Sequence, residues 1–118
     1  MTYPKAVGPY SPFYKAWNTL YCSGQIGLIP KTMQIIEWWV ENETTQVISN
    51  IWWVLKENWL DFQDVVKTTI YLDNIEDFWK INEIYAKFFS HKPARSTVEV
   101  AKLPLWALVE IEVIAIFK

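Results

Sequence analysis

The sequence predicts an α+β fold, in which a mostly antiparallel sheet carries two helices on one of its faces. Three observations predict it. Apolar residues recur at helical spacing in two segments, polar and apolar residues alternate near the C-terminus, and the elements follow the order β-β-α-β-α-β-β. With 118 residues, 52% of them hydrophobic and 20% charged, the chain is expected to form a single domain, 1–118, that buries its own core.

The first two strands are predicted at 11–16 and 19–28, joined by a turn at Trp17-Asn18. Segment 19–28 contains two glycines, and a glycine inside a strand often marks a bulge or the close approach of another backbone. A further turn is predicted at 30–33.

Two helices are predicted, at 41–58 and 76–89. Apolar residues form one face of the first helix: Val47, Ile48, Ile51, Val54 and Leu55. Apolar residues also gather on one side of the second: Phe78, Ile81, Tyr85, Phe88 and Phe89. A strand is predicted at 65–72 between the helices, and Asp73-Asn74 then supplies a turn or a helix N-cap.

The last two strands are predicted at 95–101 and 107–116, and alternation gives each of them one polar and one β-branched face. The polar faces carry Arg95, Thr97 and Glu99 in the first strand, and Leu108, Glu110 and Glu112 in the second. We expect both β-branched faces to lie against the helices, so that the polar faces align on the other side of the sheet.

If these two strands are neighbours, a pairing of Thr97 with Glu110 puts Arg95 opposite Glu112. One interpretation is a solvated sheet face with cross-strand charge pairs. The other is a functional site, in which the guanidinium of Arg95 grips a substrate carboxylate and a glutamate positions or deprotonates a water molecule. These residues alone leave both interpretations open.

Charge and cysteine content weigh against some classes of function. The net charge is −2 and no basic block stands out, which disfavours nucleic acid as a partner. The single cysteine, Cys22, cannot form an internal disulfide, as is usual in a reducing compartment, and we expect a cytoplasmic protein. No apolar stretch is long enough for a membrane span, and one His with one Cys cannot build a His/Cys zinc site.

Seven short motifs together resemble a known family. They are AVGPYS at 6–11, LYCSGQIG at 20–27, VVKTT at 65–69, NEIY at 82–85, PARSTVEV at 93–100, LP at 103–104 and ALVEIE at 107–112. In this order and spacing they resemble the RidA/YjgF/UK114 family of reactive-intermediate deaminases, over nearly the whole chain. The resemblance implies a chorismate-mutase-like fold and a homotrimer with sites at the subunit interfaces.

The resemblance also implies an activity: the hydrolysis of 2-iminobutanoate and 2-iminopropanoate, which leak from pyridoxal-phosphate enzymes, to 2-keto acids and ammonia, without a cofactor or metal. It implies that Arg95 grips the substrate carboxylate and that Glu110 orients the attacking water. The other site residues that it implies are Tyr10, Ser23, Gly24, Asn82 and Thr97.

Two further functions stay open at this point. The chain could be a non-catalytic member of the same fold that binds 2-keto acids or similar small carboxylates. It could also be an RNA-cleaving or translation-inhibiting relative, although its acidic charge weighs against that function.

The chain holds 8 tryptophans but only 3 glycines, where average usage predicts roughly eight glycines. Many members of the resembled family carry glycine at the positions of Trp17, Met33, Trp38 or Trp39, Trp59 and Trp106. Several of these are expected turn positions, where glycine supplies a positive φ cheaply. Three explanations are open: a redesigned chain, a source in which a codon read here as tryptophan specifies glycine, or a new interface.

Overall fold

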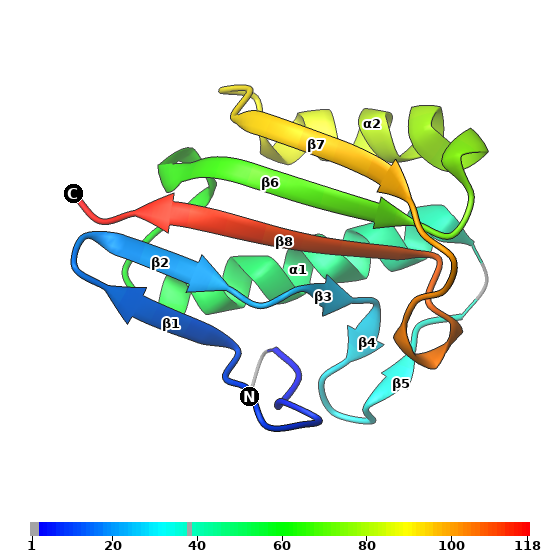
Figure 1. Ribbon diagram of the computed structural model, residues 1–118, viewed down its shortest axis with the longest axis horizontal. Coiled ribbons are helices and arrows are strands. Elements are labelled where there is room, and N and C mark those ends of the chain that lie inside the picture. The colour runs from blue at the N-terminus through cyan, green and yellow to red at the C-terminus, as the bar shows by residue number, and fades with distance from the viewer. Residues whose placement is uncertain (1–2, 38) are drawn as a thin grey trace.

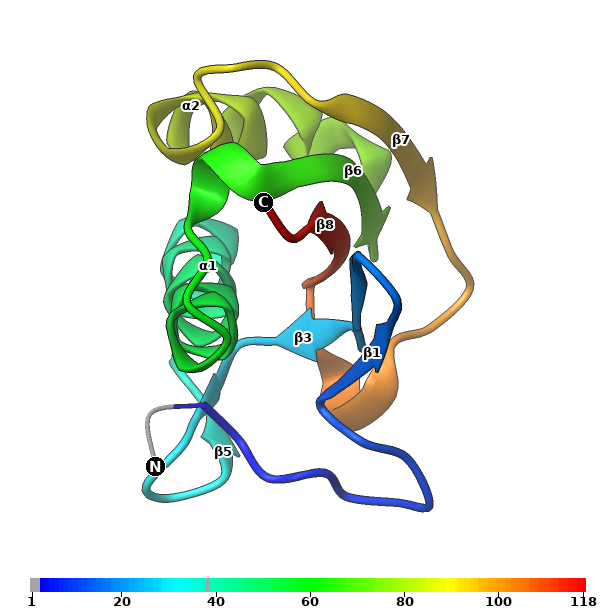
Figure 2. The same ribbon diagram turned by 90° about the vertical axis from the view of Figure 1, so that its left-hand side faces the viewer.

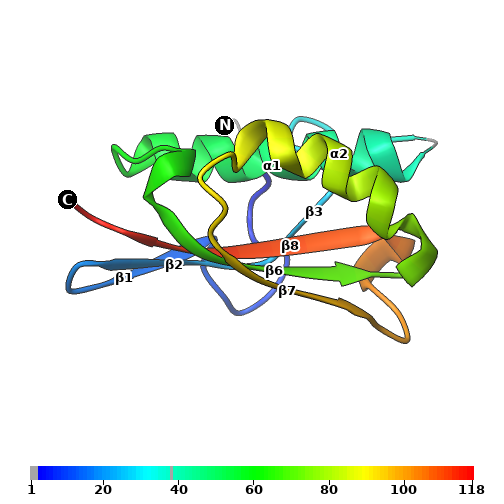
Figure 3. The same ribbon diagram turned by 90° about the horizontal axis from the view of Figure 1, so that it is seen from above.

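A twisted sheet covered on one face by two helices forms the centre of the protein, as Figure 3 shows. The structure is a computed structural model, and it describes residues 3–37 and 39–118. Its strands are β1 (Phe13–Ala16), β2 (Thr19–Cys22), β3 (Gln25–Ile26), β4 (Leu28–Ile29), β5 (Gln34–Ile35), β6 (Val65–Leu72), β7 (Ala94–Glu99) and β8 (Val109–Ile116). Its helices are α1 (Val40–Glu57) and α2 (Phe78–Phe88), with short 3-10 turns at Phe62–Asp64, Ile75–Asp77 and Pro104–Trp106. The predicted α+β class is confirmed.

The main sheet has the strand order β1-β2-β8-β6-β7, and β3 also pairs with β8 (Figure 1). Every pair in it is antiparallel except β6 with β7, which is parallel. Both helices lie on the same side of these strands, as the turned view in Figure 2 shows. We refer to the opposite side, which no helix covers, as the open face of the sheet.

The predicted pairing of the last two strands is wrong. Strand β6 lies between β7 and β8, so Thr97 does not face Glu110 and Arg95 does not face Glu112. The physical reason is the connection: β6, α2 and β7 form a β-α-β unit, whose strands run parallel and pair directly. The sequence order β-α-β at 65–101 was the signal that could have predicted this arrangement.

The predicted direction of the β7 side chains is also wrong. Arg95 is in register with Thr68, and Thr97 with Ile70, both of which are buried beneath the helices. Arg95 and Thr97 therefore lie on the helix-covered face. The β-branched Val98 lies on the open face, where 44% of it is exposed.

The predicted alternation of β8 is confirmed. Its buried positions, in register with buried positions of β6, are Val109, Ile111, Val113 and Ala115. Glu110 and Glu112 lie on the other side, the open face. The apolar face of α1 packs on β8, and all five residues predicted for it are in the core. The helix is one residue displaced from its predicted bounds.

Glycine breaks the predicted strand 19–28 into three pieces. Strand β2 ends at Cys22, β3 follows Gly24, and β4 follows Gly27. A Cβ at Gly27 would press on the backbone and side chain of Glu43 in α1, so this glycine lets the chain pass close to the helix. The amide of Asn50, also in α1, donates to the carbonyls of Ile26 (3.2 Å) and Leu28 (2.9 Å) and holds the broken strand there.

Three tryptophans occupy left-handed turn positions, as predicted. Their φ values are 53° at Trp17, 61° at Trp59 and 61° at Trp106, and Met33 has a φ of 58°. Trp39 has an extended φ of −113°, and Trp38 lies outside the described residues. Lys92 and Leu105 also have positive φ values, which the sequence did not lead us to expect.

Backbone hydrogen bonds at the end of α1 fix the left-handed conformation of Trp59. The backbone N–H groups of Trp59 and Leu60 donate to the carbonyls of Lys56 (3.1 Å) and Leu55 (2.9 Å). This pair of bonds is the Schellman motif that ends α1, and its left-handed residue is usually glycine. The indole of Trp59 is 95% exposed, so it gains almost no packing contact in return.

Among the described residues, neither helix combines the length and the apolar composition that crossing a bilayer requires.

Candidate functional site

One cavity of about 450 Å³ has Glu110 among its lining residues, and we refer to it as the Glu110 pocket. Three segments form it: the N-terminal loop, the β3 region and the 3-10 turn before β8. Its lining residues include Lys5, Val7, Tyr10, Gly24, Gln25, Ile26, Leu105 and Glu110. In Figure 1 these three segments lie below β8.

Glu110 points from β8 toward Gly24, which has no side chain to obstruct it. A Cβ atom at residue 24 would overlap the Glu110 carboxylate. Burial raises the pKa of Glu110 above its ordinary value, and the nearby charge of Glu112 raises it further. A carboxylate with a raised pKa is a stronger base, and it can take a proton from water and return it.

Tyr10 and Ser23 lie next to this pocket, but only Tyr10 lines it. Tyr10 is half exposed, and its hydroxyl accepts a hydrogen bond from the Val7 N–H (3.4 Å). The Ser23 hydroxyl donates to the carbonyl of Ser11 (2.5 Å), and its N–H donates to the carbonyl of Pro12 (2.9 Å). The hydroxyl of Ser23 therefore anchors the N-terminal loop.

A second cavity, of about 500 Å³, has Arg95 in its lining, and we refer to it as the Arg95 pocket. Its lining residues are Asn82, Tyr85, Ala86, Phe89, Ser90, Lys92, Pro93 and Arg95. The Arg95 guanidinium carbon lies 4.9 Å from the ring centroid of Tyr85 and 5.3 Å from that of Phe78. Among the described residues, Arg95 has no carboxylate within 4.0 Å. A guanidinium held on aromatic faces in this way can bind a carboxylate through its two-pronged fork.

Asn82 and Thr97 belong to the Arg95 side of the molecule. Asn82 lies on α2, one turn from both Phe78 and Tyr85, and lines the Arg95 pocket. Thr97 is two residues beyond Arg95 on the same face of β7. Its hydroxyl is buried without a hydrogen-bond partner among the described residues. An unsatisfied hydroxyl at this point is free to accept or donate a hydrogen bond to an incoming group.

The structure brings the predicted residues together as two groups, and the groups lie on opposite faces of the sheet. Arg95 is in register with Thr68 on β6, whereas Glu110 is in register with Tyr71. Thr68 and Tyr71 are three residues apart, and an odd separation along a strand means opposite faces. In one chain, the Arg95 and Glu110 side chains therefore cannot contact the same small molecule.

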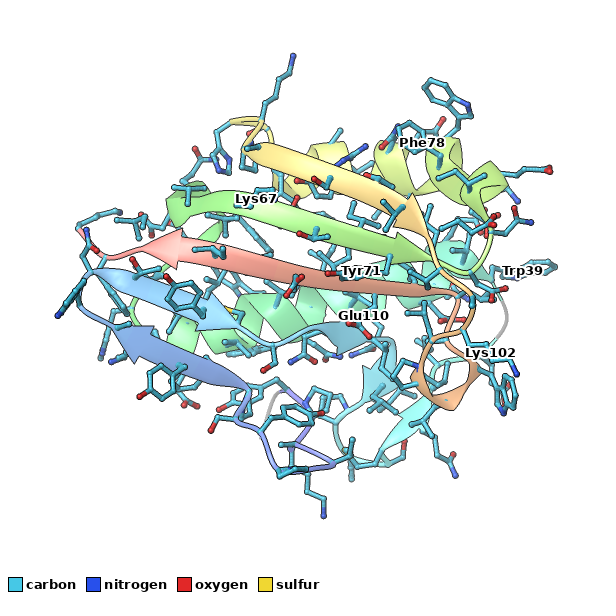
Figure 4. All side chains as sticks on the ribbon, in the orientation of Figure 1. Trp39, Lys67, Tyr71, Phe78, Lys102 and Glu110 are labelled. Carbon is cyan, nitrogen blue, oxygen red and sulfur yellow. The ribbon has the colours of Figure 1, made fainter. Side chains whose placement is uncertain are left out.

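Sequence reasoning missed the residues that accompany the two charged groups. It placed Phe78 and Tyr85 on the packing side of the second helix but did not predict that they hold Arg95. It also did not single out Tyr71, whose hydroxyl donates to Glu112 Oε1 (2.5 Å) beside Glu110. Figure 4 shows Tyr71 and Glu110 on neighbouring strands and Phe78 on α2. These partners depend on the position of β6 in the centre of the sheet.

Within residues 3–37 and 39–118, no group of three or more His, Cys, Asp or Glu side chains is placed to hold a metal ion. The nearest acidic pair to the pocket is Glu110 with Glu112, and Tyr71 occupies one oxygen of Glu112.

Comparison with known proteins assigns the chain to a family. A family model described as Endoribonuclease L-PSP matches residues 1–117. The chain is 44% identical over 114 residues to the human 2-iminobutanoate/2-iminopropanoate deaminase, and the match covers 96% of this chain and 83% of the relative. The chain belongs to the RidA/YjgF family. The resemblance found in the sequence is thereby confirmed.

Other members of the RidA/YjgF family agree in sequence and in structure. The chain is 50% identical over 113 residues to Reactive Intermediate Deaminase A, chloroplastic, of Arabidopsis thaliana; the match covers 95% of this chain and 60% of that relative. The crystal structure of Escherichia coli TdcF with bound serine superposes with a TM-score of 0.93 at 32% identity, covering 99% of this chain and 94% of TdcF. The chain therefore has relatives in a plant and in humans by sequence, and in a bacterium by structure.

Proposed function

We propose that this protein hydrolyses 2-imino acids, such as 2-iminobutanoate and 2-iminopropanoate, to 2-keto acids and ammonia. The observation that carries the proposal is the pair of complementary pockets. One presents a guanidinium that has no carboxylate partner among the described residues, and the other presents a partly buried carboxylate with a raised pKa. Relatives named as imine and reactive-intermediate deaminases, at 44% and 50% identity, support the same activity.

We further propose that the two pockets meet between subunits of a homotrimer. The Arg95 and Glu110 groups lie on opposite faces of one sheet, so one chain cannot use both on one substrate. A cyclic assembly repeats a single heterologous contact, which can bring the Glu110 pocket of each subunit against the Arg95 pocket of the next. In this arrangement, Tyr10, Gly24 and Glu110 come from one subunit, and Asn82, Arg95 and Thr97 come from its neighbour.

The residues suffice for the proposed chemistry. Arg95 binds the substrate carboxylate and fixes the imine carbon near a water molecule held by Glu110. The water oxygen forms a bond to that carbon while Glu110 takes a proton from the water. Glu110 then returns this proton to the nitrogen. As the carbon–nitrogen bond breaks, the hydroxyl oxygen of the intermediate forms the carbonyl double bond and its proton passes to Glu110, so that ammonia and the 2-keto acid leave. An iminium carbon is already electrophilic, so the reaction needs no stronger nucleophile.

The first test is an imine hydrolysis assay. An amino-acid oxidase generates the 2-imino acid in situ, and semicarbazide traps whatever has not been hydrolysed. We expect the protein to reduce the trapped product and Arg95→Ala to leave it unchanged. Full activity in Arg95→Ala would overturn the role given to the arginine, and no activity in the unmodified protein would overturn the deaminase proposal.

A second test addresses the shared site directly. Arg95→Ala and Glu110→Gln are each expected to be inactive alone. After the two are unfolded and refolded together, about a quarter of the interfaces of a random cyclic assembly combine an intact Glu110 with an intact Arg95, so activity should return. In the control, one of the two variants is replaced by the double variant Arg95→Ala/Glu110→Gln, which supplies neither an intact Arg95 nor an intact Glu110. Failure of the first mixture, with assembly intact, would contradict sites formed between subunits.

One alternative function has a specific observation in its favour. The crystal structure of TdcF holds serine, a small molecule with a carboxylate. A carboxylate-binding protein without turnover would bind a 2-keto acid in calorimetry, lose that binding in Arg95→Ala, and leave imine loss unchanged. A cytoplasmic location remains part of our proposal; it is supported by the single buried Cys22.

A further inference from the structure

Three acidic or phenolic side chains lie together on the open face of the sheet. Tyr71 on β6 is in register with Glu110 on β8, and its hydroxyl reaches diagonally to Glu112 Oε1 at 2.5 Å. Hydrogen bonding to Glu112 and burial raise the pKa of Tyr71 to about 12, so the phenol keeps its proton and is the donor. The carboxylate of Glu112 is therefore held at one place, two residues from Glu110 on the same face.

We propose that Tyr71 and Glu112 are positioning residues that set the basicity of Glu110. This role extends the proposed deaminase function. Tyr71 fixes the charge of Glu112 beside Glu110, and that charge makes the Glu110 carboxylate hold its proton more tightly. A carboxylate tuned in this way takes a proton from water more readily and can still return it to the leaving nitrogen.

Other charged and titratable groups also face Glu110 or its surroundings. Lys5 and Tyr10 of the N-terminal loop line the same pocket. Lys67 on β6 pairs with Ile114 and therefore lies on the open face. It is two residues along β6 from Thr69, which pairs with Glu112. A positive charge from Lys5 or Lys67 acts in the opposite sense to that of Glu112, so the test must remove the Glu112 charge alone.

The test is a pair of variants, of which one removes the charge of Glu112 and the other removes the hydrogen bond that positions it. Glu112→Gln removes the charge and should lower the pKa of Glu110, moving the acidic limb of the kcat/KM profile to lower pH. Tyr71→Phe keeps the Glu112 charge but releases that carboxylate from its fixed position beside Glu110, so the limb should move in the same direction by a smaller amount. Glu76→Gln, which removes an exposed carboxylate from the 3-10 turn outside the sheet, is the matched control and should leave the limb unchanged.

A direct measurement separates this inference from the deaminase proposal. The side-chain carboxyl carbon of Glu110 can be titrated by NMR in the unmodified protein and in Glu112→Gln. A lower Glu110 pKa in the variant supports the tuning role even if imine hydrolysis is never observed. An unchanged Glu110 pKa in a folded variant overturns the role, whatever the activity is.

A second inference comes from the left-handed tryptophans. Trp17, Trp59 and Trp106 have φ values of 53–61°, which is a true outlier for a bulky residue and costs about 1–3 kcal/mol at each site. Their indoles are 101%, 95% and 79% exposed in the single chain, so packing within the chain does not offset the strain. Half of the six non-glycine residues with positive φ are tryptophan, whereas none of the three glycines has a positive φ.

We infer that the source organism places glycine at positions 17, 59 and 106, through a genetic code in which a codon read here as tryptophan specifies glycine. Glycine adopts this backbone region without a steric penalty, and the Schellman motif at residue 59 normally contains it. Reading a glycine codon as tryptophan would also explain why the chain has only 3 glycines in 118 residues.

Mass spectrometry of the protein isolated from its source tests this inference. The peptides that contain positions 17, 59 and 106 should each be lighter by the difference between a tryptophan and a glycine residue. Glycine at these positions in the isolated protein would support recoding. Tryptophan at all three would overturn it and would leave the interface or redesign explanation.

Discussion

The carboxylate of Glu110 occupies the space that a side chain at Gly24 would need. The break between β2 and β3 therefore leaves the space that a side chain at the start of β8 fills. We expect Gly24→Ala to displace Glu110 and to lower kcat/KM for imine hydrolysis by about 100-fold, the usual effect of misplacing a reacting group by about 1 Å.

Gly8→Ala is the matched control for Gly24→Ala. A Cβ at residue 8 would meet the ring of Tyr10 at 3.4 Å, an ordinary contact, and its backbone is not left-handed. This variant should retain most of the activity. Equal losses of activity in the two variants would show that loop rigidity matters and that the position of Glu110 does not.

Arg95 is expected to act through its shape as well as its charge. Arg95→Lys keeps a cation near Tyr85 but loses the paired hydrogen bonds to a carboxylate. Steady-state kinetics should show a lower kcat/KM. The decrease should correspond to a loss of about 1.5–3 kcal/mol of transition-state stabilisation. Lys87→Gln, which removes an exposed charge from α2, the helix that carries Tyr85, should leave kcat/KM unchanged. Wild-type kinetics in Arg95→Lys would contradict paired binding.

Replacing a strained tryptophan should stabilise the protein. In Trp59→Gly, relief of about 1–3 kcal/mol of backbone strain exceeds the entropy cost of glycine, about 0.5–1 kcal/mol, so the free energy of unfolding should rise. In Trp79→Gly, glycine enters the helix α2 and should lower that free energy by about 0.5–1 kcal/mol. Denaturant titration of both variants measures the difference, and stabilisation by Trp79→Gly would contradict the conformational argument.

Glu43 is expected to make stability depend on pH. It is buried in α1, where one oxygen accepts a hydrogen bond from the Leu108 N–H (2.8 Å). Burial, and to a lesser degree the charge of Asp73, raise its pKa above the ordinary 4.5. Because the folded state binds this proton more tightly than the unfolded state, the contribution to stability is largest below pH 4.5 and is lost as pH rises through the raised pKa.

Glu43→Gln keeps an oxygen acceptor and cannot ionise. It should therefore unfold at higher denaturant concentration than the unmodified protein at pH 7, and the two should approach each other below pH 4.5. Glu41→Gln, in the first turn of the same helix, removes a carboxylate that interacts favourably with the helix dipole and should be slightly destabilising at pH 7. A Glu43→Gln variant less stable than the parent at pH 7 would contradict this account.

Cys22 should be inert in the folded protein. It lies buried in β2, and burial raises its pKa to about 12, so almost no thiolate exists near neutral pH. A thiol reagent such as iodoacetamide should label it only as fast as the protein unfolds, and adding denaturant should accelerate labelling. Rapid labelling under native conditions would show that the strand opens locally.

Local sequence patterns determined much of this protein. The spacing of Val47, Ile51 and Leu55 defined a helix face, and the alternation of Glu110 with Ile111 defined the two faces of β8. The missing glycines predicted strained turns, which Trp17 and Trp59 confirm. These features depend on residues a few positions apart, whose geometry is set by the chain itself.

The tertiary structure decided where the functional groups point. The face that Arg95 occupies depends on β7 pairing with β6, and a shift of one residue in such a pairing reverses every side chain. No pattern within 95–101 carries that information, because either face could be buried until the partner strand is known. The position of β6 thus separates Arg95 from Glu110 and places Tyr71 beside Glu110, since strand order is fixed by contacts between residues far apart in the sequence.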